Sequence, residues 1–187
     1  PDLGGSVAGG HGNMYWNWAE AGGAPGIDDD GNGFIDDVGG WDFVALASGT
    51  NVASGEDWRN ADKDPNDFGA HGTTVAGVIG AIVDNGIGLA GVVPRTRLMA
   101  LRIGWLPTGA GPPGGNVDMS YAAQAIRYAT TMRVPVLNLS FSSVYLSSLD
   151  AALTAAARAG TIVVNASGNG SDPNYIGTRE DVIAVAG

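Results

Sequence analysis

From about residue 72 onward, segments with helical periodicity alternate with short apolar segments of strand length. Apolar strands separated by helices form a parallel sheet that is covered on both faces. The sequence therefore predicts an α/β fold, a doubly wound parallel sheet with helices on both faces. The expected helices are residues 72–83, 119–132 and 149–159, and the expected strands are residues 97–103, 135–141, 161–164 and 181–186.

Composition limits the classes of protein that fit this pattern. With 187 residues, 44% of them hydrophobic and only 15% charged, the chain is long and apolar enough to bury a core, and one globular domain is expected. Nine basic and nineteen acidic residues give a net charge of −10, which argues against a nucleic-acid partner and suits cation binding. The chain has no cysteine, which removes disulfides and thiol catalysis. No apolar run approaches membrane-spanning length, so no membrane partner is expected for this segment.

His71 stands among small residues where a loop enters the helix expected at 72–83. Apolar residues recur along that helix at helical spacing and small residues occupy the opposite positions, which predicts a thin helix buried against close neighbours. A neutral imidazole held in the first turn of such a helix accepts a proton near physiological pH, so His71 is a candidate general base. A histidine that only caps a buried helix is the alternative.

The most acidic run, residues 26–37, is a candidate calcium loop. It offers side-chain oxygens at the first, third, fifth and ninth positions of such a loop and a glycine at the turn. The twelfth position is Gly39 and not a glutamate, so the match to an EF-hand is incomplete. A cluster of Asx turns without an ion is the competing interpretation. The candidate ligands are Asp28, Asp30, Asn32 and Asp36.

Two further polar segments follow expected strands: Ser140-Phe141-Ser142, and Ala166-Ser167-Gly168-Asn169-Gly170. In parallel sheets of this kind, function gathers at the carboxyl ends of the strands, so both segments are candidates for a site. An ordinary Gly-Asn-Gly turn is the alternative for the second.

Several of these segments together resemble the subtilisin-like serine peptidases. His71-Gly72-Thr73 followed by Val75-Ala76-Gly77 resembles the family's catalytic-histidine segment, with Thr74 in place of a second, non-catalytic histidine. The acidic run followed by Gly-Trp-Asp-Phe at 40–43 resembles an insertion found ahead of that segment in many bacterial members. Asn138 and Ser140 match the family's substrate-binding strand, with Ser142 where glycine is usual, and the segment ending in Asn169 resembles the one that supplies the oxyanion hole.

The resemblance implies an endopeptidase that acts on proteins and peptides, with a subtilisin-like three-layer sandwich fold. His71 is then the general base and Asn169 the oxyanion donor, while Ser140, Phe141, Ser142, Ala166, Ser167 and Gly168 bind substrate, together with the backbone of 108–111. The family's Gly-Thr-Ser-Met-Ala segment does not occur between residues 1 and 187. We therefore expect the chain to be a partial catalytic domain truncated at both ends, with the aspartate before residue 1, the serine beyond residue 187, and no activity on its own. A secreted or cell-surface location follows from the resemblance alone.

The resemblance also implies a structural calcium site. The turn at 83–89 is similar to the turn that forms the family's strong calcium site, and Pro-Asp-Leu at 1–3 is similar to the segment that supplies its carboxylate. Oxygen ligands of this kind suit calcium better than zinc. A glycine-rich turn without an ion is the alternative. The ligands carried over are Asp2, Asn85 and the carbonyls of Val83, Ile87 and Leu89.

Other functional classes remain open at this point. A calcium-dependent binding module would use the acidic run but would leave the contexts of His71 and Asn169 unexplained. In an inactive peptidase homologue, the full-length protein would lack the catalytic aspartate and serine. A nucleotide-binding domain would need a glycine-rich fingerprint or a P-loop lysine after a strand, and the loops here contain neither.

Overall fold

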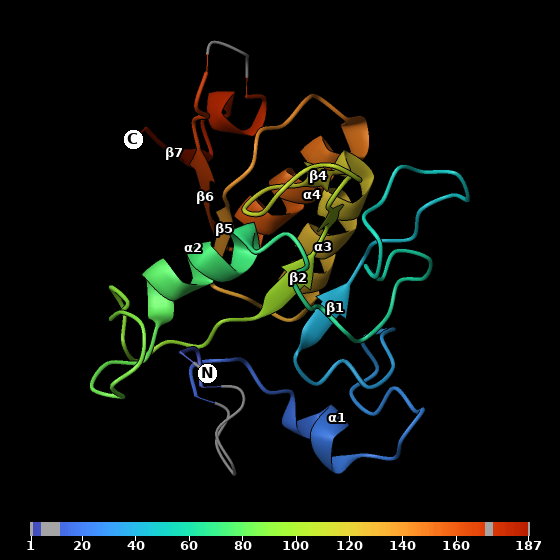
Figure 1. Ribbon diagram of the computed structural model, residues 1–187, viewed down its shortest axis with the longest axis vertical. Helices are drawn as coiled ribbons and strands as arrows, with labels where there is room; N and C mark the ends of the chain where they lie inside the picture. Colours follow the sequence, from blue (N-terminus) through green and yellow to red (C-terminus); the bar gives the residue numbers. More distant parts are fainter. Residues whose placement is uncertain (1, 5–11, 171–173, 187) are drawn as a thin grey trace. The chain divides into compact units, whose positions relative to one another are not determined.

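The computed structural model describes residues 2–4, 12–170 and 174–186. The chain divides into two compact units, one up to Asn116 and one from Val117 on, and each is described separately below. Figure 1 shows the helices and strands along the chain.

The first unit has little regular structure. It contains α1 (Trp18–Gly22), β1 (Gly40–Asp42), α2 (His71–Gly80), β2 (Ala100–Arg102) and β3 (Gly104–Trp105). β1 and β2 pair in parallel, with Trp41 opposite Leu101, and β3 pairs with β4 (Asn116–Val117) in a second small sheet. Neither α1 nor β1 was expected from the sequence. Residues 45–67 form no helix or strand, and an isolated antiparallel bridge between Asp42 and Asp62 joins them to the end of β1.

A buried ionic cluster joins these irregular segments. Arg102, at the end of β2, forms ion pairs with Asp42 at the end of β1 and with Glu56, whose carboxylate oxygen lies 2.6 Å away. The same guanidinium donates to the carbonyl of Asp57 at 2.6 Å, and the other oxygen of Glu56 accepts from the Leu106 N–H. All three charged side chains are buried. Two carboxylates share one guanidinium, so the cluster has a net negative charge inside the protein.

The second unit has the predicted β/α alternation. It contains α3 (Met119–Thr131), β5 (Val136–Leu139), α4 (Ser147–Arg158), β6 (Ile162–Ala166), the 3₁₀ turn η1 (Ile176–Thr178) and β7 (Val182–Val185). The strands form a parallel sheet in the order β5-β6-β7. α3 and α4 lie side by side (Figure 1), and α4 packs on β6. This confirms the predicted parallel α/β arrangement.

Small side chains allow α3 and α4 to pack closely. Six of their ten buried residues are alanine, and the others are Ile126, Tyr128, Leu149 and Leu153. Asp118 caps the start of α3 by accepting a hydrogen bond from the Ser120 N–H. Gly160, which has a φ of 88°, follows the end of α4, as its sequence position predicts.

The surroundings of α2 differ from the expectation of a buried helix. Of its ten residues only Gly80 is buried, where an added Cβ would meet the Thr96 side chain at 2.6 Å. Val78 is 54% exposed, and Val92, which hydrogen-bonds back to it through the backbone, is 80% exposed. The apolar face of α2 therefore has too few apolar partners among the described residues to be buried.

The ionic cluster leads to a prediction about pH. Burial raises the pKa of Asp42 to about 6 from its ordinary value near 3.8, against the opposing effects of the Val44 N–H and Arg102. Because this pKa is higher in the folded state, folding takes up a proton between about pH 4 and 6, and the contribution of Asp42 to stability is lost as the pH rises through that window. The amide that Asp42→Asn introduces stays neutral at every pH in this range. We therefore expect the free energy of unfolding of the variant, relative to the wild type, to rise by up to about 3 kcal/mol between pH 4 and 7.

Denaturant unfolding at a series of pH values measures this difference. Asp64→Asn, which makes the same carboxylate-to-amide change at an exposed position, is the control, and the rise for Asp42→Asn should exceed any change seen for it. A difference for Asp42→Asn that is flat, or that falls with pH, would contradict the prediction.

Candidate active site and metal sites

His71 is the first residue of α2 and its side chain is exposed. The chain enters the helix through Ala70, which has a left-handed φ of 59°. The carboxylate of Asp67 caps the helix start by accepting from the Thr73 N–H at 2.7 Å. The hydroxyl of Thr74 donates to the Ala70 carbonyl at 2.8 Å, so this side chain bonds to the start of its own helix. His71 is thus fixed at its backbone while its imidazole remains accessible, as a general base requires.

A glycine-rich loop lies against the segment just before His71. The Gly114 N–H donates to the Gly69 carbonyl at 3.0 Å, and a Cβ on Gly69 would lie 2.2 Å from the Gly114 carbonyl oxygen. Only glycine therefore fits at Gly69. Thr108, at the start of the predicted substrate segment 108–111, is bonded instead to Asn51 and Val52, and 108–111 form no strand. The sequence reasoning missed Gly114, for which the Gly114-Gly115 pair was the available signal.

In the second unit, the predicted substrate residues come together where β5 and β6 end. Leu139 opposite Asn165 is the last registered pair, and Ser140–Ser142 and Ala166–Gly168 continue from these strands. A Cβ on Gly168 would lie 3.8 Å from the Ser142 hydroxyl, so the two segments remain close to each other. The Ser140 hydroxyl accepts from the Asn138 amide at 2.9 Å.

Asn169 is exposed and follows Gly168, whose φ is 99°. It therefore lies at the carboxyl edge of the sheet with the predicted substrate residues. Whether it donates to an oxyanion stays a prediction, as does the role of His71, which belongs to the other unit.

The acidic run does not gather its four predicted ligands at one point. Asp28 accepts from the N–H groups of Gly31, Asn32 and Gly33, and so caps its own turn. Asp36 pairs with Lys63 at 2.7 Å and accepts from the Gly26 N–H. The hydrogen bonds from Lys63 and Gly26 hold the pKa of Asp36 below its ordinary value. Asn32 forms an Asx turn, because its side-chain oxygen accepts from the Phe34 N–H at 2.8 Å while its amide donates to Asp30 and Asp37.

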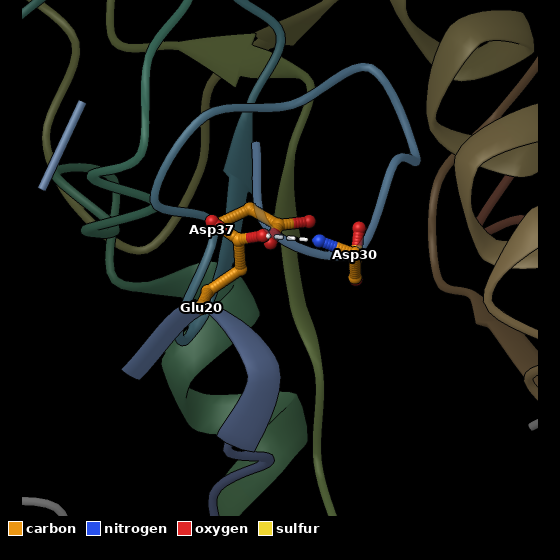
Figure 2. A group of neighbouring side chains, drawn as sticks. All are labelled: Glu20, Asp30 and Asp37. Atoms are coloured by element: carbon orange, nitrogen blue, oxygen red, sulfur yellow. Dashed lines mark hydrogen bonds between the residues drawn. The ribbon is translucent and has the colours of Figure 1, made fainter. Parts of the chain in front are cut away.

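Asp30 instead joins Glu20 and Asp37, as Figure 2 shows. One carboxylate oxygen from each lies within 4.8 Å of the others, and both Glu20 and Asp37 are buried. Glu20 accepts from the Asp29, Asp30 and Asp36 N–H groups, and the Asn17 amide donates to both Asp30 and Asp37. Burial and the charges of Asp37 and Asp30 raise the pKa of Tyr15 nearby. This acidic triad, Glu20, Asp30 and Asp37, offers oxygen ligands suited to a hard cation.

At the second predicted metal site, Asp2 lies against the 83–89 turn, although the two are far apart in the sequence. The Asp2 carboxylate accepts from the Asn85 amide and from the Leu89 N–H, each at 3.2 Å, and a Cβ on Gly88 would lie 2.3 Å from it. The Asn85 side-chain oxygen accepts from the Ile87 N–H. A hollow of about 200 Å³ is lined by residues 82–90, which include the predicted carbonyl donors. These residues fit a calcium ion only in part. The amide nitrogen of Asn85 faces Asp2, so the amide must rotate before its oxygen can bind an ion there. Pro1, the first residue of the predicted segment, lies outside the described residues.

Sequence comparisons agree with these features. The model of the subtilase family matches residues 27–187. A thermophilic serine proteinase of Bacillus sp. (strain AK1) is 37% identical over 137 residues, which are 72% of this chain and 32% of that protein. Thermitase of Thermoactinomyces vulgaris is 32% identical over 152 residues, 80% of this chain and 47% of that protein.

Among solved structures, sphericase matches with a TM-score of 0.56 and 26% identity, over 77% of this chain and 44% of that chain. The chain thus spans between about a third and a half of the length of these proteins. Among the described residues, no helix is long and apolar enough to cross a membrane. With a family match over most of its length and an α/β fold shared with a subtilisin-like structure, the chain belongs to the subtilase family.

Proposed function

We propose that this chain is part of a serine-type endopeptidase in which His71 is the general base and Asn169 an oxyanion donor. The observation that carries the proposal is the exposed His71 at the capped start of α2, in a His-Gly-Thr segment of a chain that belongs to the subtilase family. The serine and the aspartate of the triad come from parts of the protein outside these 187 residues. The chain alone is then inactive, because triad groups act as a unit.

In the proposed reaction, His71 takes the proton of the serine hydroxyl as its oxygen attacks the carbonyl carbon of the peptide bond. The carbonyl oxygen becomes an oxyanion, to which the Asn169 amide donates a hydrogen bond. The peptide C–N bond then breaks, and His71 gives its proton to the leaving amine. Water then hydrolyses the acyl-serine ester. His71 takes a proton from the attacking water and gives it to the serine oxygen as the ester bond breaks.

Proteins and extended peptides are the proposed substrates. The strand end at Ser140–Ser142 offers backbone to which an extended peptide adds as a further strand, and Ala166–Gly168 lies beside it as a second proposed substrate contact. Gly114, held beside Gly69, brings a second backbone segment near the start of α2. Action outside the cell belongs to the same proposal and rests on the family resemblance.

Calcium is the proposed structural cofactor, at two places. At the acidic triad, a bound ion would offset the repulsion among three carboxylates and tie α1 to the 28–37 loop. At the 83–89 turn, it would tie Asp2 to the segment after α2. Neither ion takes part in the proposed reaction.

The role of His71 is tested in the full-length protein. We expect His71→Ala to abolish hydrolysis of a peptide substrate, since no other group takes the proton of the serine. Thr74→Ala is the matched control on the same helix, and it should retain activity because the Thr74 hydroxyl bonds only to its own helix backbone. Equal activity in His71→Ala and the wild type would contradict the proposal, and an inactive wild type would identify an inactive homologue.

The role of Asn169 is tested by steady-state kinetics. We expect Asn169→Ala to lower kcat by about 10²–10³ with little change in KM, because its donor matters when charge develops on the oxygen. The magnitude is the one known for this donor in subtilisin, so it is borrowed from a relative. Gln124→Ala, which removes an exposed amide on α3, is the control. An unchanged kcat would remove Asn169 from the site.

Calcium binding is tested by thermal unfolding with and without the ion. Binding to the folded state alone raises stability by about 2.7 kcal/mol at a concentration one hundred times Kd. We expect Asp30→Asn to reduce the calcium-dependent rise in Tm and the matched variant Asp28→Asn to leave it unchanged, because Asp30 belongs to the acidic triad and Asp28 caps its own turn.

The double variant Asp2→Ala, Asn85→Ala tests the second site in the same way. If Asp30→Asn has no more effect than Asp28→Asn, the acidic triad is not a calcium site. If the double variant keeps the full calcium-dependent rise, the 83–89 turn is not one.

A further inference from the structure

The paired part of β5 and β6 ends just before the proposed substrate residues. Leu139 opposite Asn165 is the last pair in register, and from there β6 continues beside β7, with Ala166 opposite Val185. The Ser167 N–H and hydroxyl also bond to the Val185 carbonyl. The end of β6 is therefore fixed on the β7 side, while its separation from the end of β5 depends on other contacts.

The side chain of Asn165 makes those contacts. Its amide donates to the Leu139 carbonyl at 2.6 Å and to the Phe141 carbonyl at 3.2 Å. The side chain is 0% exposed, and a Cβ on Gly177 would lie only 3.4 Å from its oxygen. One buried amide thus bonds to two carbonyls of the departing strand, those of residues 139 and 141, in place of the backbone donors that paired β5 with β6.

Asn174 and Ser143 complete the network around Asn165. The Asn174 amide donates to the Asn165 side-chain oxygen at 2.9 Å and to the Ala166 carbonyl at 2.5 Å. Its own oxygen accepts from the N–H and the hydroxyl of Ser143, and the Ser143 hydroxyl accepts from the Ile176 N–H. The network therefore connects the end of β5, the end of β6 and η1 through side chains that are all buried.

A buried network of this kind is rigid, because each broken bond leaves a buried polar group without its partner. Amides do not titrate, so its geometry is also independent of pH in the working range. The reach of one asparagine side chain then sets the distance between Ser140–Ser142 and Ala166–Gly168.

We propose that Asn165, supported by Asn174 and Ser143, is a positioning residue that sets the separation of these two strand ends, and so the size of substrate side chain that binds against them. The inference rests on the proposed peptidase function. A site whose groups are displaced by about 1 Å loses both affinity for substrate and discrimination between substrates. The network can therefore affect substrate selection without touching the substrate.

The test uses the full-length protein and two peptide substrates that differ only in the residue before the scissile bond, alanine or phenylalanine. Asn165→Ala removes the donor to both carbonyls and allows the strand ends to separate. We expect the ratio of kcat/KM for phenylalanine over alanine to rise at least fivefold. Ser143→Ala, a milder change in the same network, should move the ratio in the same direction by at least twofold and keeps the test valid if Asn165→Ala does not fold.

Thr161→Val is the matched control at the other end of the same strand. It removes a buried hydrogen bond, from the Thr161 hydroxyl to the Val134 carbonyl at 2.9 Å, without touching the network. It should lower Tm and leave the ratio unchanged. An active wild-type protein whose ratio stays constant, or falls, in Asn165→Ala and Ser143→Ala would overturn the inference alone. An inactive wild-type protein would overturn the proposed function and the inference with it.

Discussion

The guanidinium of Arg102 is the group on which the irregular first unit depends. It lies at the end of a three-residue strand and reaches Asp42, Glu56 and the Asp57 carbonyl, so one side chain joins β1, β2 and the 53–57 segment. Sheets this small do not supply enough backbone pairing to order the loops around them. A buried charge with two partners supplies that order at the cost of desolvation, and the excess carboxylate makes the unit sensitive to protonation. Because Glu56 also accepts from Leu106, the cluster extends toward the loop that ends beside Gly69.

The second unit has its own ion pairs, from Arg179 to Asp150 and Asp181, but at the end of the β5–β6 ladder it relies on neutral groups. Where the β5–β6 ladder ends, the Asn165 and Asn174 amides take over the carbonyls that the departing strands leave behind. A network of amides fixes geometry without adding a net charge. The contacts that order the unit containing His71 thus include a group that titrates, Asp42. The strand ends proposed to bind substrate are held by amides, which do not titrate.

The sequence predicted the second unit well because the signal there is local. The alanine faces of α3 and α4 and the apolar β5, β6 and β7 are each visible within a short window. β1 was missed because three residues become a strand only by pairing with β2, sixty positions later. Asp30 was named as a candidate ligand, but its partner Glu20 lies in another element, where no loop spacing reveals it. Asn165 was passed over because a single amide inside an apolar strand looks like an interruption, and its role depends on carbonyls 24 and 26 residues away in the chain. The expected burial of α2 was wrong for the described residues, since periodicity shows which face is apolar and does not show what covers it.

The exposed face of α2 has a consequence for how copies of this chain behave together. Val78, Leu89 and Val92 present apolar surface on the same unit as most of the acidic side chains. A net charge of −10 keeps copies apart at long range, while contact between apolar faces is attractive once they meet. Salt screens the first effect over about 8–10 Å at physiological strength and leaves the second in place. We therefore expect the balance between repulsion and attraction among copies of this chain to depend on ionic strength.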